Sequence, residues 1–445
     1  MRPIPFNALA KLLGLQHANQ VLVQGIAIDS RKILPGDLFF ALPGNKVDGH
    51  AFLQEAVSKG AVGAIVHESY QDVSLKLPVL RVPDVLVALQ DLARKTLAKR
   101  SSKVIAITGS LGKTTTKDFA SALLATRYKV FSSPLSYNSQ ATVPLSILMA
   151  EGTEEYLILE MGMTHAGNIE NLISIAPPSI ALITTVAIQH ASNFSDGLLG
   201  IGREKAMIFT HPKTELGLLH HDIPHYDEVI SAGMCPKKTF SMHSQEAHYF
   251  LEKTSQGARI HVKGEEPYEI DLDLPLKVHY QNFLAATALA RSLDVPWHLI
   301  REVAPFLKLP SMRFEQVEKQ GILFINDAYN ANPDSMKAAL ESLPTAKPGG
   351  KVIAVLSEMD ALGAYTKEGH AQVAEMALLH ADHLLCLGAH CKIMCTIWNR
   401  AQMPAELFEC RSSLASVLKQ LAKPGDVVLL KGARAYALDT LLNCF

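Results

Sequence analysis

The chain has 445 residues, of which 48% are hydrophobic and 19% charged, and its formal net charge is -1 at pH 7. This length exceeds what one hydrophobic core usually supports and the composition excludes an intrinsically disordered chain, so two or three folded domains are expected. A net charge this close to zero creates no field that attracts nucleic acid or an anionic membrane, so nucleic acid is not an expected partner and any anionic substrate must be held by local groups.

The N-terminal residues contain no apolar stretch followed by a small-residue cleavage site, and no later run approaches the roughly 18 apolar residues of a membrane-spanning helix. The six cysteines show no paired CxxC spacing, which is typical of reduced thiols that serve as packing residues. We therefore expect a cytoplasmic enzyme without a membrane span, and a monomer by default. His390, Cys391 and Cys395 could meet on one helix and hold a metal ion, but no second ligand pair follows at zinc-site spacing.

The first expected domain covers residues 1–85. Its segment 51–61 has the periodicity of an amphipathic helix, and the apolar pieces VQGIAI and LFFAL are separated by residues rich in Gly, Pro and Asp. This pattern predicts short strands joined by ordered loops. The loops are either plain turns or, held by a rigid scaffold, the part of the domain that grips a ligand.

The second expected domain covers residues 86–310, where buried strands alternate with helices. Its strands are near-continuous apolar runs, as expected for a parallel sheet covered on both faces: KVIAIT (103–108), YLILE (156–160) and IALITTV (180–186). One helix is predicted from about Thr114 and another over residues 282–293.

A glycine-rich loop, TGSLGKTTTK at 108–117, follows the first of these strands. Gly109 and Gly112 allow close approach of the backbone to phosphate, the ammonium of Lys113 can neutralise phosphate charge, and the hydroxyl of Thr114 can bind magnesium. The general pattern GxxxxGK[ST] requires glycine at position 107, where this chain has Ile107, so the loop is a shortened variant. It predicts binding of ATP or GTP with Mg²⁺; the alternative is a glycine turn that carries a surface lysine.

Residues 311–445 form the third expected domain. Its predicted strands are again short apolar runs separated by helical stretches: ILFIN (322–326), KVIAVL (351–356), HLLCLG (383–388) and DVVLLKG (426–432). The whole chain is therefore expected to be an α/β protein of three domains: a small N-terminal α/β domain, a central P-loop ATPase-like domain with a mostly parallel sheet, and a C-terminal Rossmann-like domain.

The shortened loop GSLGKTTTK resembles that of the Mur ligases and of the related folylpolyglutamate synthetase. The opening segment DSRKILPGDLFFALPG and the closing LLKGAR are also similar to Mur ligase motifs, in the family's order, so the resemblance covers nearly the whole chain. The segment DAYNANPDSM at 327–336 looks like that of the members that join D-alanyl-D-alanine to a UDP-N-acetylmuramoyl tripeptide. The resemblance implies ATP-dependent amide ligation through an acyl phosphate, in peptidoglycan precursor synthesis, with UDP bound by the first domain.

Three alternatives stay open. Members that add the third amino acid carry a DNPR loop in the third domain, which this chain lacks, and folylpolyglutamate synthetase lacks a UDP-binding first domain. A third alternative, a regulator that binds ATP without ligating, remains because several motifs depart from the family pattern. The departing residues are Thr185, Ala187, Ser192, Met207, Ser139 after Asn138, Val278 and His279 ahead of Asn282, and SEMDALG at 357–363.

The resemblance implies a catalytic set of Lys113, Glu160, His190 and Lys205. Glu160 closes the strand YLILE, where α/β sheets bind ligands, and it would bind magnesium together with Thr114 and His190. Lys205 would be carbamylated and turn its carbamate toward magnesium, which requires a neutral amine and therefore a lowered pKa. The plainer alternatives are a surface carboxylate at a strand end, a polar loop histidine, and an exposed helix lysine beside a glutamate.

The resemblance places the nucleotide on the loop residues Gly109, Ser110, Leu111, Gly112, Lys113, Thr114 and Thr115. Asn282 would read adenine, unless it is only the N-cap of the following helix. Arg313 and Asp327 would contact phosphate and ribose once the third domain closes, unless they are a surface ion pair or a strand-end cap.

The substrate-binding residues implied by the resemblance lie in all three domains. Ser30 and Arg31 would hold the UDP end, since arginine suits a diphosphate, but the same residues also fit a β-turn with a solvated arginine. Asn138 belongs to the central domain. Tyr329, Asn330 and Asn332 would hold nucleotide or D-alanyl-D-alanine, although NANP by itself is only a turn.

Overall fold

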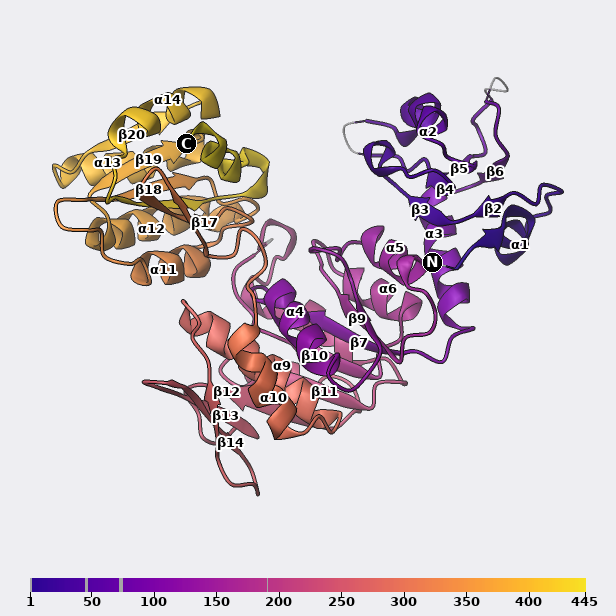
Figure 1. Cartoon of the computed structure of the whole chain (residues 1–445), viewed down its shortest axis with the longest axis horizontal. Helices are drawn as coiled ribbons and strands as arrows, with labels where there is room; N and C mark the ends of the chain where they lie inside the picture. Colours follow the sequence, from indigo (N-terminus) through magenta and orange to yellow (C-terminus); the bar gives the residue numbers. More distant parts are fainter. Residues whose placement is uncertain (1, 45–46, 72–74, 190) are drawn as a thin grey trace.

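The computed structural model describes residues 2–44, 47–71, 75–189 and 191–445. Figure 1 shows three α/β bodies, with the N-terminal one at the upper right, the central one below and the C-terminal one at the upper left. Within these ranges no helix is long and apolar enough to cross a membrane. The α/β architecture with several parallel sheets is the expected fold class.

The N-terminal body contains a four-stranded parallel sheet in the order β3-β4-β5-β6. Its strands are β3 (Gly25–Ala27), β4 (Asp37–Phe40), β5 (Gly63–His67) and β6 (Val79–Val82). A small antiparallel pair, β1 (Ile4–Pro5) and β2 (Leu22–Val23), flanks helix α1 (Phe6–Leu12). The helix predicted over 51–61 is shorter: a 3-10 turn at Gly49–Phe52 leads into α2 (Leu53–Ser58).

Helix α3 (Val85–Leu97) joins the N-terminal body to the central one. The carboxylate of Asp84 accepts a hydrogen bond from the amide of Val87 and caps the helix. One continuous apolar cluster contains Phe6 of α1, Leu89 of α3 and Leu159 of the central sheet. The first two bodies therefore share a core across the predicted boundary at residue 85.

The central sheet has nine strands in the order β15-β14-β13-β12-β11-β10-β7-β9-β8, and only the two pairings at its β15 edge, β15 with β14 and β14 with β13, are antiparallel. The strands are β7 (Lys103–Thr108), β8 (Val130–Ser132), β9 (Tyr156–Glu160), β10 (Ile180–Ile183), β11 (Leu216–His220), β12 (Lys237–Ser241), β13 (Tyr249–Thr254), β14 (Gly257–Val262) and β15 (Tyr268–Asp271). Strand β10 ends at Ile183, earlier than predicted. Beyond it, the amide of Thr184 still donates to the carbonyl of Thr108, and the carbonyl of Thr185 accepts from the amide of Ser110 in the glycine-rich loop.

Helices cover both faces of this sheet, as its buried strands require. Alternate residues of β7 point to opposite faces: Ile105 packs in the cluster that contains α4 and α9, and Ala106 packs in the cluster that contains α3, α5 and α6. The helices are α4 (Lys113–Leu124), α5 (Thr142–Met149), α6 (Asn168–Ile175), α7 (Leu198–Ala206), α8 (Tyr226–Ile230), α9 (Lys277–Ser292) and α10 (Trp297–Val303).

The C-terminal sheet has the order β16-β17-β21-β18-β19-β20, and only β16 is antiparallel to its neighbour. Its strands are β16 (Glu315–Lys319), β17 (Ile322–Asp327), β18 (Val352–Ser357), β19 (His383–Leu387), β20 (Ala405–Phe408) and β21 (Val427–Lys431). Helices α11 (Pro333–Glu341), α12 (Thr366–His380) and α13 (Lys392–Arg400) pack on one face, and α14 (Arg411–Leu421) packs on the other.

All six cysteines are free thiols. Cys386, Cys391 and Cys395 are buried in the core of the C-terminal domain, as expected of packing residues. The expectation is wrong for Cys410, which is exposed. In the described part of the chain, no three His, Cys, Asp or Glu side chains are grouped as in a metal site.

Candidate functional site

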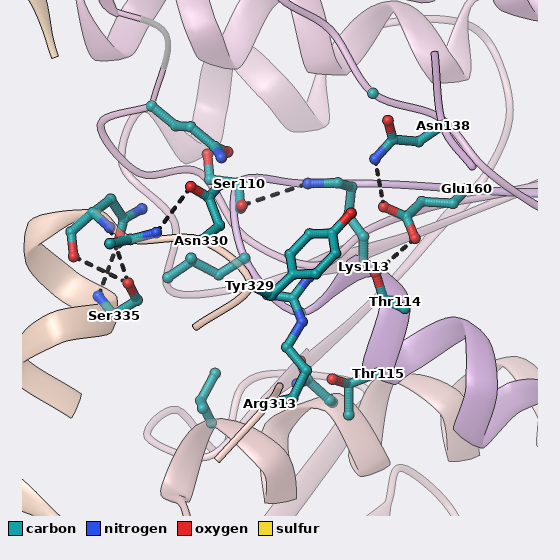
Figure 2. A pocket seen from close by; sticks show the side chains of 18 of the residues that line it. Ser110, Lys113, Thr114, Thr115, Asn138, Glu160, Arg313, Tyr329, Asn330 and Ser335 are labelled. Carbon is teal, nitrogen blue, oxygen red and sulfur yellow. Dashed lines mark hydrogen bonds between the residues drawn. The ribbon is translucent and has the colours of Figure 1, made fainter. Parts of the chain in front are cut away.

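A cleft of about 390 Å³ lies between the central and C-terminal domains (Figure 2). The central domain lines it with the phosphate loop and with Asn138, Glu160, Lys205 and Asn282; the C-terminal domain lines it with Arg313, Asp327, Tyr329, Asn330 and Asn332. The structure thus brings together most of the residues that the sequence singles out. Of the remaining ones, Gly109 lies beside the cleft, Ser30 and Arg31 lie in the N-terminal domain, and His190 lies outside the described residues.

The phosphate loop runs from the end of β7 to the start of α4 and is held by the segment after β10. The amide of Ser110 donates to the carbonyl of Thr185 at 2.9 Å, and the Ser110 hydroxyl donates to the carbonyl of Ala187 at 2.9 Å. Gly112 precedes α4 with a φ of +79°, in the left-handed region that favours glycine. The first residues of α4 line the cleft, so the N-terminus of this helix opens onto it, and helix N-termini suit phosphate groups.

Lys113 is the first residue of α4 and points into the cleft (Figure 2). Its ammonium donates to the carbonyl of Gly109 at 2.7 Å. Burial lowers the pKa of Lys113, the carboxylate of Glu160 opposes this shift, and the nearby Arg313 adds to it. Lys113 is half-buried in the cleft and its ammonium bonds to the loop carbonyl, so a lysine extended into solvent does not describe this geometry.

Glu160 is buried at the end of β9 and accepts hydrogen bonds from two neighbouring side chains. Strands β7 and β9 are parallel and pair Ile107 with Glu160, so this carboxylate ends beside the phosphate loop. The hydroxyl of Thr114 donates to its Oε2 at 2.8 Å and the amide of Asn138 donates to its Oε1 at 2.7 Å (Figure 2). The Glu160 residue is 1% exposed, so the alternative of a surface carboxylate is wrong.

Lys205 on α7 also lines the cleft and is 3% exposed, so it is not an exposed helix lysine. Burial lowers its pKa well below the usual value, the charge of Lys113 adds to this, and Glu204 opposes it. The Glu204 carboxylate instead accepts hydrogen bonds from the amides of Gly167 and Ile169 at the start of α6. The lowered pKa favours the neutral amine that carbamylation requires.

The third domain presents Arg313 and Asp327 side by side, because β16 and β17 form an antiparallel hairpin. Asp327 accepts from the amide of Phe314 at 3.1 Å and from the ammonium of Lys431 at 2.5 Å. Because Asp327 and Lys431 are both buried, the alternative of a surface ion pair is wrong for Asp327. The Arg313 guanidinium lies over the ring of Tyr329, 4.1 Å from its centroid.

Sequence reasoning left Lys431 without a role, although a signal for it existed. Lys431 closes the buried strand β21, as Glu160 closes β9, and a charge at that position is buried only when a partner or ligand compensates it. Its ammonium also donates to the carbonyl of Asn330 at 3.2 Å. Lys431 therefore fixes both Asp327 and the loop that follows it.

Asn332 begins helix α11 and touches the central domain. Its side chain accepts from the amide of Ser335 at 2.8 Å, and its own amide donates to the Ser335 hydroxyl, which is a complete capping box. Its side-chain amide also reaches the carbonyl of Ile188 at 3.5 Å. The NANP segment is thus a helix start at the domain interface as well as a turn.

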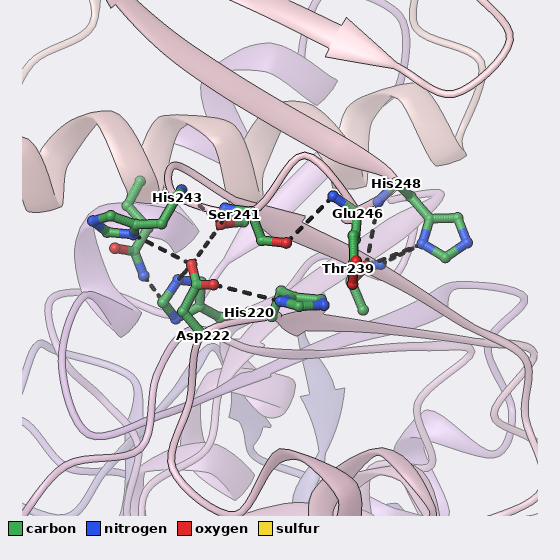
Figure 3. A network of polar contacts seen from close by, with 10 residues as sticks. His220, Asp222, Thr239, Ser241, His243, Glu246 and His248 are labelled. Atoms are coloured by element: carbon green, nitrogen blue, oxygen red, sulfur yellow. Dashed lines mark hydrogen bonds and ion pairs between the residues drawn. The ribbon is translucent and has the colours of Figure 1, made fainter.

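Asn282 lies inside α9, which begins at Lys277, so the alternative that it is only the N-cap of this helix is wrong. A network around Asp222 holds the start of this helix (Figure 3). The carboxylate of Asp222 lies against the rings of His220 and His243. The His220 ring also bonds to the side chain of Gln281 at 3.0 Å. The His243 ring bonds to the ammonium of Lys277 at 2.8 Å. The face of α9 that carries Asn282 is therefore fixed toward the cleft.

Ser30 and Arg31 form a 3-10 turn in the N-terminal domain, away from this cleft. The Ser30 hydroxyl donates to Glu55 at 2.7 Å, whereas Arg31 is exposed and pairs with Asp29 at 2.8 Å. Next to them, the ammonium of Lys32 donates to the hydroxyl of Tyr137 in the central domain at 3.1 Å. A turn with a solvated arginine describes this geometry, and a role in binding UDP stays a prediction.

Comparison with known proteins gives a consistent result across the chain. Family models match residues 22–96 (Mur ligase family, catalytic domain), 107–290 (Mur ligase middle domain) and 312–434 (Mur ligase, glutamate ligase domain). The chain is 30% identical to the UDP-N-acetylmuramoyl-tripeptide--D-alanyl-D-alanine ligase of Bacillus subtilis, covering 95% of this chain and 93% of that protein. It is 33% identical to the protein of the same name from Treponema pallidum, over 94% and 92%.

Solved structures agree with these relatives. A crystal structure of MurF from Acinetobacter baumannii superposes with a TM-score of 0.85 at 25% identity, covering 100% of this chain and 98% of that one. MurF ligase from Thermotoga maritima in complex with ADP superposes with a TM-score of 0.75 at 27% identity, covering 95% and 97%.

Proposed function

The chain belongs to the Mur ligase family, and from this premise we propose that it joins D-alanyl-D-alanine to UDP-N-acetylmuramoyl-tripeptide while ATP is converted to ADP and phosphate. Relatives that carry this activity in their names match nearly the full length of the chain. The observation that carries the proposal is the cleft, in which a phosphate loop, a buried carboxylate and a buried low-pKa lysine meet the arginine of a second domain.

ATP binds with its phosphates against the loop 109–115 and the N-terminus of α4. Lys113 supplies the positive charge there, and Arg313 approaches from the other side of the cleft. Asn282 and Asp327 hold the nucleoside. The division into domains at 1–85, 86–310 and 311–445 assigns the UDP end to the first domain, ATP to the second, and completion of the ATP site to the third.

The residues present suit magnesium. The Thr114 hydroxyl and the Glu160 carboxylate lie 2.8 Å apart, and such hard oxygen ligands are those that Mg²⁺ prefers. We assign Thr114, Glu160, His190 and carbamylated Lys205 to this role, His190 by resemblance alone. The bound cation supplies positive charge that reduces the repulsion between a substrate carboxylate and the ATP phosphates.

The reaction has two steps. A carboxylate oxygen of the tripeptide attacks the γ phosphorus, the bond from phosphorus to the bridging oxygen breaks, and ADP and an acyl phosphate form. The neutral amine of D-alanyl-D-alanine then attacks the acyl carbon, phosphate leaves with the bonding electrons, and the nitrogen loses a proton. In the first step, Lys113 and Arg313 stabilise the charge on the transferred group.

The two substrates are held by different domains of the chain. Ser30, Arg31 and Asn138 serve the UDP-tripeptide, and Tyr329, Asn330 and Asn332 serve D-alanyl-D-alanine or nucleotide. Asn138 already bonds to Glu160, which supports a position for the acceptor carboxylate beside the γ phosphate. We expect the enzyme to act as a monomer in the cytoplasm, where both substrates and ATP occur together.

Phosphate release and product mass test the proposal. The full-length protein with ATP should release phosphate only when UDP-tripeptide and D-alanyl-D-alanine are both present, and the product should be the UDP-pentapeptide. Lys113→Ala serves as the inactive control. A product formed from UDP-dipeptide and a free amino acid would instead indicate the ligase that adds the third residue, and ATP binding without any product would indicate a regulator.

A further inference from the structure

His279 lies in the cleft but has no part in the roles assigned above. It occupies α9 one helical turn before Asn282, lines the same cleft and is 4% exposed. Its Nδ1 atom is buried and has no hydrogen-bond partner in the described structure. Buried polar atoms are almost always paired, so an unpaired ring nitrogen in a ligand cleft indicates that its partner comes from a ligand.

Packing alone does not explain a histidine at this position. A leucine of similar size would fill the same space without leaving a polar atom unsatisfied. The helix offers a direct comparison in Thr287, which is also fully buried and has an unpaired hydroxyl, but which does not line the cleft.

The imidazole of His279 is uncharged at neutral pH. Burial lowers its pKa to about 3, and the positive charges of Arg313 and Lys431, which approach from the C-terminal domain, add to this shift. A neutral imidazole has one donor and one acceptor nitrogen, so it suits a neutral polar group better than a phosphate. The cations that face it already supply the positive charge of the site.

The position along α9 indicates which part of the nucleotide His279 meets. Asn282 lies against Gly112, where the phosphate loop ends. His279 lies one turn nearer the start of α9, close to the charges of Arg313 and Lys431. We propose that His279 is a specificity-determining residue that hydrogen-bonds the nucleoside of ATP, through the base or a ribose hydroxyl. This inference rests on the proposed function, because it assumes that ATP occupies the cleft.

Nucleotide titration of the full-length protein tests the inference. His279→Leu should weaken ATP binding about tenfold, the size of one lost hydrogen bond, while the melting temperature without nucleotide stays unchanged or rises. His279→Asn, which keeps a polar atom near the Nδ1 position, should recover most of the affinity. Thr287→Val removes an unpaired hydroxyl from the same helix and should leave the affinity for ATP as in the wild type.

ITP, 2′-deoxy-ATP and inorganic tripolyphosphate identify the contact. If His279 contacts the amine of the base, wild type and His279→Leu should bind ITP with equal affinity. If His279 contacts the 2′-hydroxyl of the ribose, the two proteins should bind 2′-deoxy-ATP with equal affinity. Equal affinity of wild type and His279→Leu for ATP, or an equal loss for all ligands including tripolyphosphate, would overturn the inference. Failure of the wild type to bind ATP at all would instead reject the proposed function.

Discussion

The side-chain oxygen of Asn282 lies 2.1 Å from the point that a Cβ atom would occupy at Gly112. Helix α9 therefore packs directly against the backbone of the phosphate loop. Gly112 is restricted twice, by this contact and by its φ of +79°. These two restrictions can be separated by mutation.

Gly112→Ala should weaken ATP binding about tenfold or more, because the added methyl must displace Asn282 or the loop backbone. Gly14→Ala is the matched control: Gly14 also has a φ of +79°, but an added Cβ would meet nothing within 4 Å. The control should lose about 1 kcal/mol of stability and no affinity for ATP. Equal ATP affinity in both variants, measured by calorimetric titration, would contradict the packing of α9 on the loop.

Lys205→Ala should lower kcat about 100-fold, the usual effect of removing one electrostatic stabiliser. Formate or acetate should restore part of the activity, because a small carboxylate can replace the carbamate oxygens. Chloride at the same ionic strength is the control for a general salt effect. Phosphate release measures both, and rescue by chloride as strong as rescue by acetate would rule out the carbamate.

Lys205→Met should raise the melting temperature in bicarbonate-free buffer, most strongly at neutral and lower pH. The folded state holds the pKa of Lys205 well below 10.5, so between the two values the unfolded chain binds more protons and wild-type stability rises with pH. The difference in melting temperature between Lys205→Met and the wild type should therefore shrink as the pH approaches 10. Lys337→Met replaces an exposed lysine of α11 by the same residue and is the matched control for the change in residue type.

Lys431→Ala should destabilise the C-terminal domain by about 3 kcal/mol, because it leaves the Asp327 carboxylate buried without its charged partner. The double variant Lys431→Met, Asp327→Asn should recover much of this loss, since no buried charge remains. Urea unfolding followed by the fluorescence of Trp398, which is buried in this domain, measures the difference. A double variant less stable than Lys431→Ala would contradict the assignment of an isolated charge pair.

Local pattern predicted the strands that carry the site. The loop 108–117, with Lys113, and Glu160 stand out in the sequence because each follows or closes a short apolar run. The structure confirms the buried strands β7, β9, β17 and β21. The sequence pattern does not predict strand β16. Its sequence EQVEK has no apolar face, and the strand forms because it pairs with β17.

Other parts of the site depend on distant contacts. Lys431 and Asp327 are 104 positions apart, and no local signal pairs them. The early start of α9 follows from burial of His279 and Tyr280, whose neighbours Lys277 and Gln281 are fixed by the histidines of another segment. Such contacts are set by tertiary packing, which a single sequence does not display.

The two walls of the cleft belong to sheets that share no strand, and Leu276 of the central domain packs in the apolar cluster of the C-terminal domain. A compound that binds Lys113 on one wall and Tyr329 on the other would therefore act as a crosslink between domains. Its residence time would depend on how fast the domains separate as well as on the strength of each contact. Inhibitor affinity for this enzyme should accordingly respond to substitutions at the domain interface that touch no inhibitor atom, such as those at Asn332 beside Ile188.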